Sequence, residues 1–142
     1  MTAPNTKRSA AYGIWPSPIT AAVVAAGASP LSQPQLDGDA VYWLAGRASE
    51  GGRTTMLRQR GSEIVEMTPA PFNVRTRVHE YGGGASLVAA GVVWFSHFAD
   101  NRIYVIRDGQ IAESGSHQEL TLMDNGLYAS LIKLQFENTE SN

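Results

Sequence analysis

The chain has 142 residues, of which 43% are hydrophobic and 17% charged, so it can form one domain, and its composition excludes wholesale disorder and fibrous structure. The net charge of −2 and the pI near 5.9 provide no general attraction to nucleic acid, which we do not expect as a partner. Cysteine is absent, which excludes disulfides, thiolate zinc sites and cysteine nucleophiles and fits a reducing, cytoplasmic location.

The N-terminal part contains no evident signal peptide, and residues 1–11 are predicted to be flexible. Two prolines make residues 12–18 an extended segment, because each proline removes a backbone donor and disfavours helix before it. The alanine-rich residues 19–28 predict a short helix. That run is half the length of a transmembrane helix, so no membrane span is expected.

Short β-branched and aromatic runs separated by glycine turns predict strands in the middle of the chain. The predicted strands are residues 41–44, 53–60, 63–67, 85–89 and 92–98. Residues 73–78 are also expected to be extended. Strands at intervals of about 8–12 residues are typical of a sandwich, a barrel or a propeller, and the spacing alone does not separate these folds.

The pattern changes after residue 102. Residues 103–106 and 110–113 predict a hairpin around the turn Asp108-Gly109, and Ser116 with Glu119 forms a capping box that begins a helix. Residues 126–136 predict an amphipathic helix whose apolar side includes Leu127, Leu131 and Leu134, and residues 137–142 should fray. Residues 1–102 hold nine basic and seven acidic side chains, whereas residues 103–142 hold two and six, which mildly favours two origins.

Catalytic motifs are missing from both halves. Ser86 lies in Gly84-Ala85-Ser86-Leu87-Val88, which lacks the second glycine of a nucleophile elbow, so we interpret it as a strand residue. His79 and Glu80 are neighbours that a strand would point to opposite faces. The two lysines, Lys7 and Lys133, do not follow a glycine-rich phosphate loop. We therefore predict no catalytic residue and no cofactor.

Other polar clusters have simpler structural explanations. His117 and Glu119 have the wrong spacing for a shared metal face and suit helix capping, so no metal site is predicted. The acidic pairs flank glycine turns, where solvated carboxylates are expected; they are Asp37 with Asp39 and Glu63 with Glu66. Arg75 and Arg77, near Tyr81, are expected on a solvated strand face. Core packing is the expected role of the large aromatic residues Trp15, Tyr42, Trp43, Trp94 and Phe95.

One resemblance covers about ninety residues. The segments 12–19, 36–39, 41–44, 50–53, 73–84 and 95–100 resemble prolyl oligopeptidase-family serine peptidases of the acylaminoacyl-peptidase or dipeptidyl-aminopeptidase type. The resemblance implies that residues 12–102 are the start of the N-terminal β-propeller, which screens substrates for a separate hydrolase domain. That family's catalytic triad lies in the later domain and has no counterpart here.

A second resemblance covers about thirty-five residues. The segments 102–106, 108–111, 113–120 and 126–131 resemble the C-terminal end of an ABC-transporter ATP-binding domain. In that family the segment follows a switch histidine, but His97 is too close to Arg102 for that role. The family's phosphate loop, signature motif and catalytic acid have no counterparts here.

The sequence thus predicts a mainly β chain, with a partial propeller of roughly two blades over residues 12–102. An ABC-ATPase-like hairpin and helices follow over residues 103–136. We expect a non-catalytic peptidase-type fragment that self-associates through exposed β edges or contacts a protein or peptide. A small protein-protein interaction module and an accessory piece of an ABC transporter ATPase are the alternatives. The two ranges meet at a join near residues 100–104, and the sequence fits a natural, an artefactual or an engineered origin of this join equally.

Overall fold

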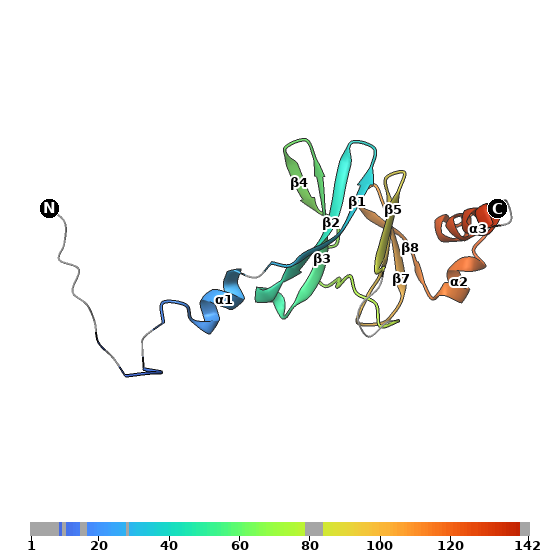
Figure 1. Cartoon of the computed structure of the whole chain (residues 1–142). Helices are drawn as coiled ribbons and strands as arrows, with labels where there is room; N and C mark the ends of the chain where they lie inside the picture. The colour runs from blue at the N-terminus through green and yellow to red at the C-terminus, as the bar shows by residue number, and fades with distance from the viewer. Residues whose placement is uncertain (1–8, 10, 15–16, 28, 79–83, 140–142) are drawn as a thin grey trace.

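The computed structural model of the chain describes residues 9, 11–14, 17–27, 29–78 and 84–139. Two four-stranded antiparallel sheets are followed by two helices (Figure 1). The first sheet contains β1 (Leu31–Asp37), β2 (Ala40–Arg47), β3 (Arg53–Arg60) and β4 (Glu63–Glu66). The second contains β5 (Ser86–Ala89), β6 (Val92–Ser96), β7 (Ile103–Arg107) and β8 (Gln110–Gly115). The remaining elements are α1 (Ala21–Gly27), the 3₁₀ turn η1 (Ala48–Glu50), α2 (His117–Thr121) and α3 (Leu127–Thr139).

Each sheet is a simple meander in which every strand pairs with the next one along the chain. In the first sheet, Tyr42 lies opposite Arg58 and Leu44 lies opposite Met56. In the second, Trp94 lies between Leu87 of β5 and Val105 of β7. Two four-stranded meanders are the architecture of two propeller blades, so the predicted mainly β, partial-propeller fold is confirmed.

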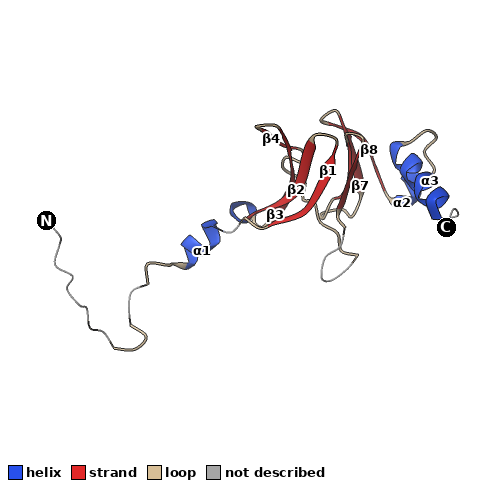
Figure 2. Cartoon of the chain, turned by 45° about the horizontal axis from the view of Figure 1, so that its top comes forward, coloured by secondary structure: helices blue, strands red, loops and turns tan. Residues whose placement is uncertain are grey.

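The main core lies between the two sheets, which stand side by side in both views (Figures 1 and 2). The buried side chains that the sheets contribute to it include Tyr42, Leu44, Met56, Val88, Val93, Phe95 and Ile106. Two polar side chains of β1 also join the sheets. Gln35 accepts a hydrogen bond from the Val88 amide, and the Asp37 carboxylate accepts hydrogen bonds from the Ala90 and Gly91 amides.

The two C-terminal helices cover the far face of the second sheet (Figures 1 and 2). Val92, Trp94 and Val105 of the sheet are buried in one cluster with Leu120 of α2 and Tyr128 of α3. The predicted capping box is confirmed, because the Ser116 hydroxyl accepts from the Glu119 amide and the Glu119 carboxylate accepts from the Ser116 amide. The chain therefore forms three layers, namely the first sheet, the second sheet and a helical cover.

Some local predictions differ from the structure. β1 was not predicted, and residues 73–78 form no named strand, although Val74 makes a single bridge to His97. Leu134 is 58% exposed and is not part of the packed face of α3, which is formed by Leu127, Tyr128, Leu131 and Ile132. α3 continues to Thr139, into the segment that was expected to fray.

Most of the flexible N-terminus predicted for residues 1–11 lies outside the described residues. The predicted short helix is present as α1. No helix in the described part of the chain is long and apolar enough to cross a membrane.

Candidate functional site

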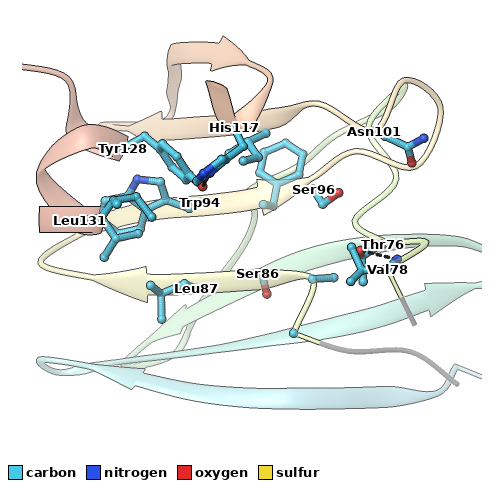
Figure 3. A pocket seen from close by; sticks show the side chains of 15 residues that line it. Thr76, Val78, Ser86, Leu87, Trp94, Ser96, Asn101, His117, Tyr128 and Leu131 are labelled. Atoms are coloured by element: carbon cyan, nitrogen blue, oxygen red, sulfur yellow. Dashed lines mark hydrogen bonds between the residues drawn. The ribbon is translucent and has the colours of Figure 1, made fainter. Parts of the chain in front are cut away.

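A cavity of about 440 Å³ lies between the second sheet and α3. Figure 3 shows Ser86 and Leu87 along β5 on one side of it and Tyr128 and Leu131 of α3 on another. The cavity exists because α3 covers β6 and β7 but reaches only part of β5, where Leu87 stays partly exposed. Its walls are mostly apolar, with the hydroxyl groups of Thr76, Ser86 and Ser96 near the start of β5 and the end of β6.

Trp94 forms the floor of this cavity beside α3 (Figure 3). Its side chain is buried, and its Nε1–H has no hydrogen-bond acceptor among the described residues. The neighbouring Tyr128 hydroxyl lies 2.8 Å from Nδ1 of His117, and burial raises the pKa of Tyr128. An unpaired indole donor beneath a covering helix indicates imperfect polar complementarity between the sheet and its cover.

Ser86 is a strand residue, as predicted, and it begins β5. Its hydroxyl accepts a hydrogen bond of 3.2 Å from the Gln35 amide group of the first sheet. Ser86 and His117 both line the cavity, but no hydrogen bond joins Ser86 to a histidine within the described residues. A serine nucleophile requires a base within hydrogen-bond reach, and this pair lacks that arrangement.

Side chains around residues 97–104, where the two resemblances meet, are connected by hydrogen bonds and ring contacts. The Tyr104 hydroxyl donates to the Asp100 carboxylate at 2.8 Å, and the Tyr104 ring stacks on Phe95 at 5.5 Å between centroids. The hydrogen bond to Asp100 and burial raise the pKa of Tyr104. His97 is buried and its Nδ1 accepts from the Asn73 amide. These groups make structural contacts across residues 100–104.

Two carboxylates expected to be solvated have structural partners instead. Asp37 is bonded to the β5–β6 turn, as described above, and Glu66 accepts from Arg53 at 2.7 Å and from the Thr55 hydroxyl at 2.7 Å. The Arg53 hydrogen bond lowers the pKa of Glu66, against the opposing effect of burial. The prediction of solvated carboxylates was therefore wrong for these two residues, which are half-buried. Asp39 and Glu63 are exposed, as expected.

The remaining candidates are structural or fall outside the described residues. Arg75 and Arg77 lie in a loop, and each guanidinium carbon is within 4.4 Å of the centre of the Phe98 ring. Their predicted place on a strand was wrong. The structure does not describe Trp15, His79, Glu80 and Tyr81. Within the described ranges, no three His, Asp or Glu side chains gather into a metal-binding group.

Comparison with known proteins gives two kinds of match, and no family model matches the sequence. A puromycin-hydrolysing peptidase of Mycobacterium tuberculosis is 41% identical, with a TM-score of 0.67, and the match covers 78% of this chain. A puromycin hydrolase structure is 38% identical over 73% of this chain, with a TM-score of 0.65. Both are prolyl oligopeptidase-family peptidases, and this chain spans 17% of each.

The second kind of match is to ABC transporter B family members 17 and 22 of Arabidopsis thaliana. They are 56% and 54% identical over 41 residues, which is 28% of this chain and 3% of each transporter. Both predicted resemblances are confirmed. The chain is similar to the N-terminal part of prolyl oligopeptidase-family peptidases and, over a short segment, to ABC transporters.

The length of the first structural match shows whether the peptidase-like region ends at residue 102. Residues 1–102 make up about 72% of the chain, whereas the first peptidase match covers 78% of it. That match therefore extends beyond Arg102 into the segment that resembles the transporters. The sequence alone did not reveal this overlap, because the two resemblances were assigned to separate ranges.

Proposed function

We propose that this chain is a non-catalytic protein-interaction module of two propeller blades, in which the C-terminal segment completes and covers the second blade. The pairing of β7 with β6 is the observation that carries this proposal. Four residue pairs from Val93↔Ile106 to Ser96↔Ile103 continue the sheet across the predicted boundary, and α2 and α3 then cover its far face. A segment attached without a structural role would not be expected to pair with the backbone N–H and C=O groups along the edge of β6.

The state of the candidate catalytic groups supports a role in binding. Ser86 is held by Gln35, His117 contacts Tyr128, and His97 accepts from a backbone amide. Each of these groups has a structural partner, and no serine hydroxyl is hydrogen-bonded to a histidine within the described residues. A sheet surface without a serine-histidine pair can present side chains to another polypeptide but offers no activated serine.

An accessory role in an ABC transporter is the second candidate, favoured by the 56% identity over 41 residues. In that role the C-terminal segment would use its apolar side chains to contact a transporter domain. Leu120 and Tyr128 are instead buried against the second sheet, so this surface is already occupied within the chain. The two-blade module is therefore the better supported proposal.

The absence of catalysis is tested by incubating the full chain with puromycin and with a fluorogenic aminoacyl substrate, and by titrating it with ATP. We expect no hydrolysis above buffer and no saturable ATP binding. The Ser86→Ala variant is the matched control, because hydrolysis that survives this change comes from another residue or a contaminant. Hydrolysis by the wild type that Ser86→Ala abolishes would overturn the proposal.

A further inference from the structure

The strand registers place a row of apolar residues on the outside of the first sheet. Residues directly opposite each other on antiparallel strands share a face. Leu36 lies opposite Val41, Trp43 opposite Leu57, and Gln59 opposite Ile64. These residues alternate with Tyr42, Leu44 and Met56, which face the second sheet. The outer apolar face is the set Leu36, Val41, Trp43, Leu57 and Ile64. Gln59 and Glu66 lie on the same side of the sheet, and Glu66 is paired with Arg53.

This outer apolar face is open to solvent. Leu36 is 79% exposed, Ile64 is 57% exposed and Val41 is 37% exposed. Trp43 and Leu57 are half-buried, and neither belongs to the clusters of packed apolar side chains in the described part of the chain. Figures 1 and 2 show α2 and α3 beyond the second sheet and α1 beyond one end of the first, so no labelled helix covers this face.

The outer faces of the two sheets differ, and this difference indicates which partner the exposed face would bind. The far face of the second sheet is covered by α2 and α3 of the same chain, which leaves one uncovered blade face in the described part of each chain. When one face meets the same face of a second copy, a twofold contact forms and association stops at two chains. The border of this face carries charges of both signs: Arg60 is paired with Asp39 at 2.9 Å, and Glu63 lies opposite Arg60. Two copies placed face to face would therefore not be repelled by charges of one sign.

The size of the face also fits a second copy. The four strands have 7, 8, 8 and 4 residues, which at about 3.3 Å per residue and about 4.8 Å between strands present roughly 430 Å². Two such faces bury roughly 860 Å², which is in the range of weak, transient protein contacts. A contact of this size suits a dimer whose population depends on protein concentration.

We propose that two copies of this chain associate through their outer apolar faces into a twofold dimer of stacked blades. This inference rests on the proposed interaction module and names its partner as a second copy of the chain. The contact is face to face and leaves the strand edges unpaired.

Sedimentation equilibrium of the full chain between about 1 and 100 µM tests the proposal. We expect the weight-average mass to rise from one chain to two and no further. Ile64→Lys should weaken dimerisation at least tenfold, because it places a charge in each half of a buried apolar contact. The matched control is Leu122→Lys, which changes an 82% exposed leucine near α2 and should leave dimerisation unchanged. Thermal unfolding by circular dichroism verifies that both variants fold.

A covalent test is possible because the chain contains no cysteine, so that an introduced cysteine is its only thiol. Val41→Cys on β2 should form a disulfide-linked dimer under mild oxidation, whereas Ile111→Cys on β8 should not. A wild-type monomer across the concentration range would overturn the dimer, as would equal weakening by Leu122→Lys. Neither result depends on the hydrolysis and ATP assays, so failure of the dimer and failure of the non-catalytic proposal are separately visible.

Discussion

At the scale of single residues, Arg53 holds the end of the first sheet against the loop that follows it. Its guanidinium donates to the Thr68 and Phe72 carbonyls and to the Glu50 and Glu66 carboxylates, and its side chain is buried. A planar group with several donors is needed to bond four acceptors at once. Lysine cannot reproduce that arrangement.

Arg53→Lys is therefore expected to lower the free energy of unfolding by about 3 kcal/mol, because buried acceptors lose their donor. Arg60→Lys is the matched control, since Arg60 forms an exposed pair with Asp39 and should change stability by less than about 0.5 kcal/mol. Urea denaturation measures both. Equal effects of the two substitutions would contradict the structural role of Arg53.

The Glu66 carboxylate should give the protein a pH-dependent stability. Its hydrogen bond from Arg53 lowers its pKa below the usual 4.5, with burial opposing and the Thr55 hydroxyl contributing. A lowered folded-state pKa means that this stabilisation is complete above pH 4.5 and is lost as the pH falls through the folded value. Glu66→Gln should flatten the dependence of unfolding free energy on pH below 4.5.

Urea melts at several pH values between about 3 and 6 check this expectation. Glu63→Gln on the same strand shows how much of any change comes from removing one negative charge. A wild-type slope retained in Glu66→Gln would exclude Glu66 as its source.

At the scale of elements, β-branched and aromatic runs between glycine turns predicted strands correctly, whereas the strand interrupted by Pro34 was missed. β1 contains Pro34 and an irregular register between Ser32 and Gln35, with Gln33 at a φ of 50°. An edge strand tolerates proline because one side needs no hydrogen bonds. The bonds from Gln35 and Asp37 to the second sheet join residues more than fifty positions apart, which no local pattern encodes.

The β7–β8 turn shows the opposite case, in which local sequence was sufficient. Asp108 and Gly109 have φ angles of 53° and 75°, as the hairpin prediction from Asp-Gly requires. Gly109→Ala should destabilise the protein by about 1 kcal/mol, because a Cβ is disfavoured at positive φ. Gly84→Ala, where φ is not positive and the space is open, should cost much less in thermal unfolding. Equal losses would exclude the turn as the cause.

The contact between β6 and the helices contains the unpaired Trp94 indole. Trp94→Phe removes ring atoms and also removes a buried donor without an acceptor, so the two effects oppose each other. The free energy of unfolding should change by less than about 1 kcal/mol, whereas Phe95→Ala in the inter-sheet core should cost about 3 kcal/mol. A loss above about 2 kcal/mol for Trp94→Phe, measured by urea denaturation, would indicate that the indole donor has a partner.

At the scale of the whole molecule, the family resemblances indicated what each half is related to but not how the halves pack. The sequence assigned residues 12–102 and 103–136 to separate units, and that boundary stays a prediction. The sheet nevertheless continues through it, with Tyr104 packed against Phe95 and Arg102 paired with Glu119. Resemblance to two families did not show whether the sheet continues past residue 102, because which strands pair is settled only when the chain folds.

Two truncations separate the contributions of the hairpin and the helices. A chain of residues 1–102 leaves β6 as an edge and removes Val105 and Ile106 from their cores, so we expect no cooperative thermal unfolding. A chain of residues 1–115 keeps both sheets but uncovers Val92 and Trp94, so it has an apolar face at each end of the stack. Faces at both ends permit open-ended association, so this chain should form larger species in sedimentation than the full chain. A compact monomer of residues 1–115 would show that the helices are not needed to cover the second sheet. Cooperative unfolding of residues 1–102 would show that the hairpin is not needed for folding.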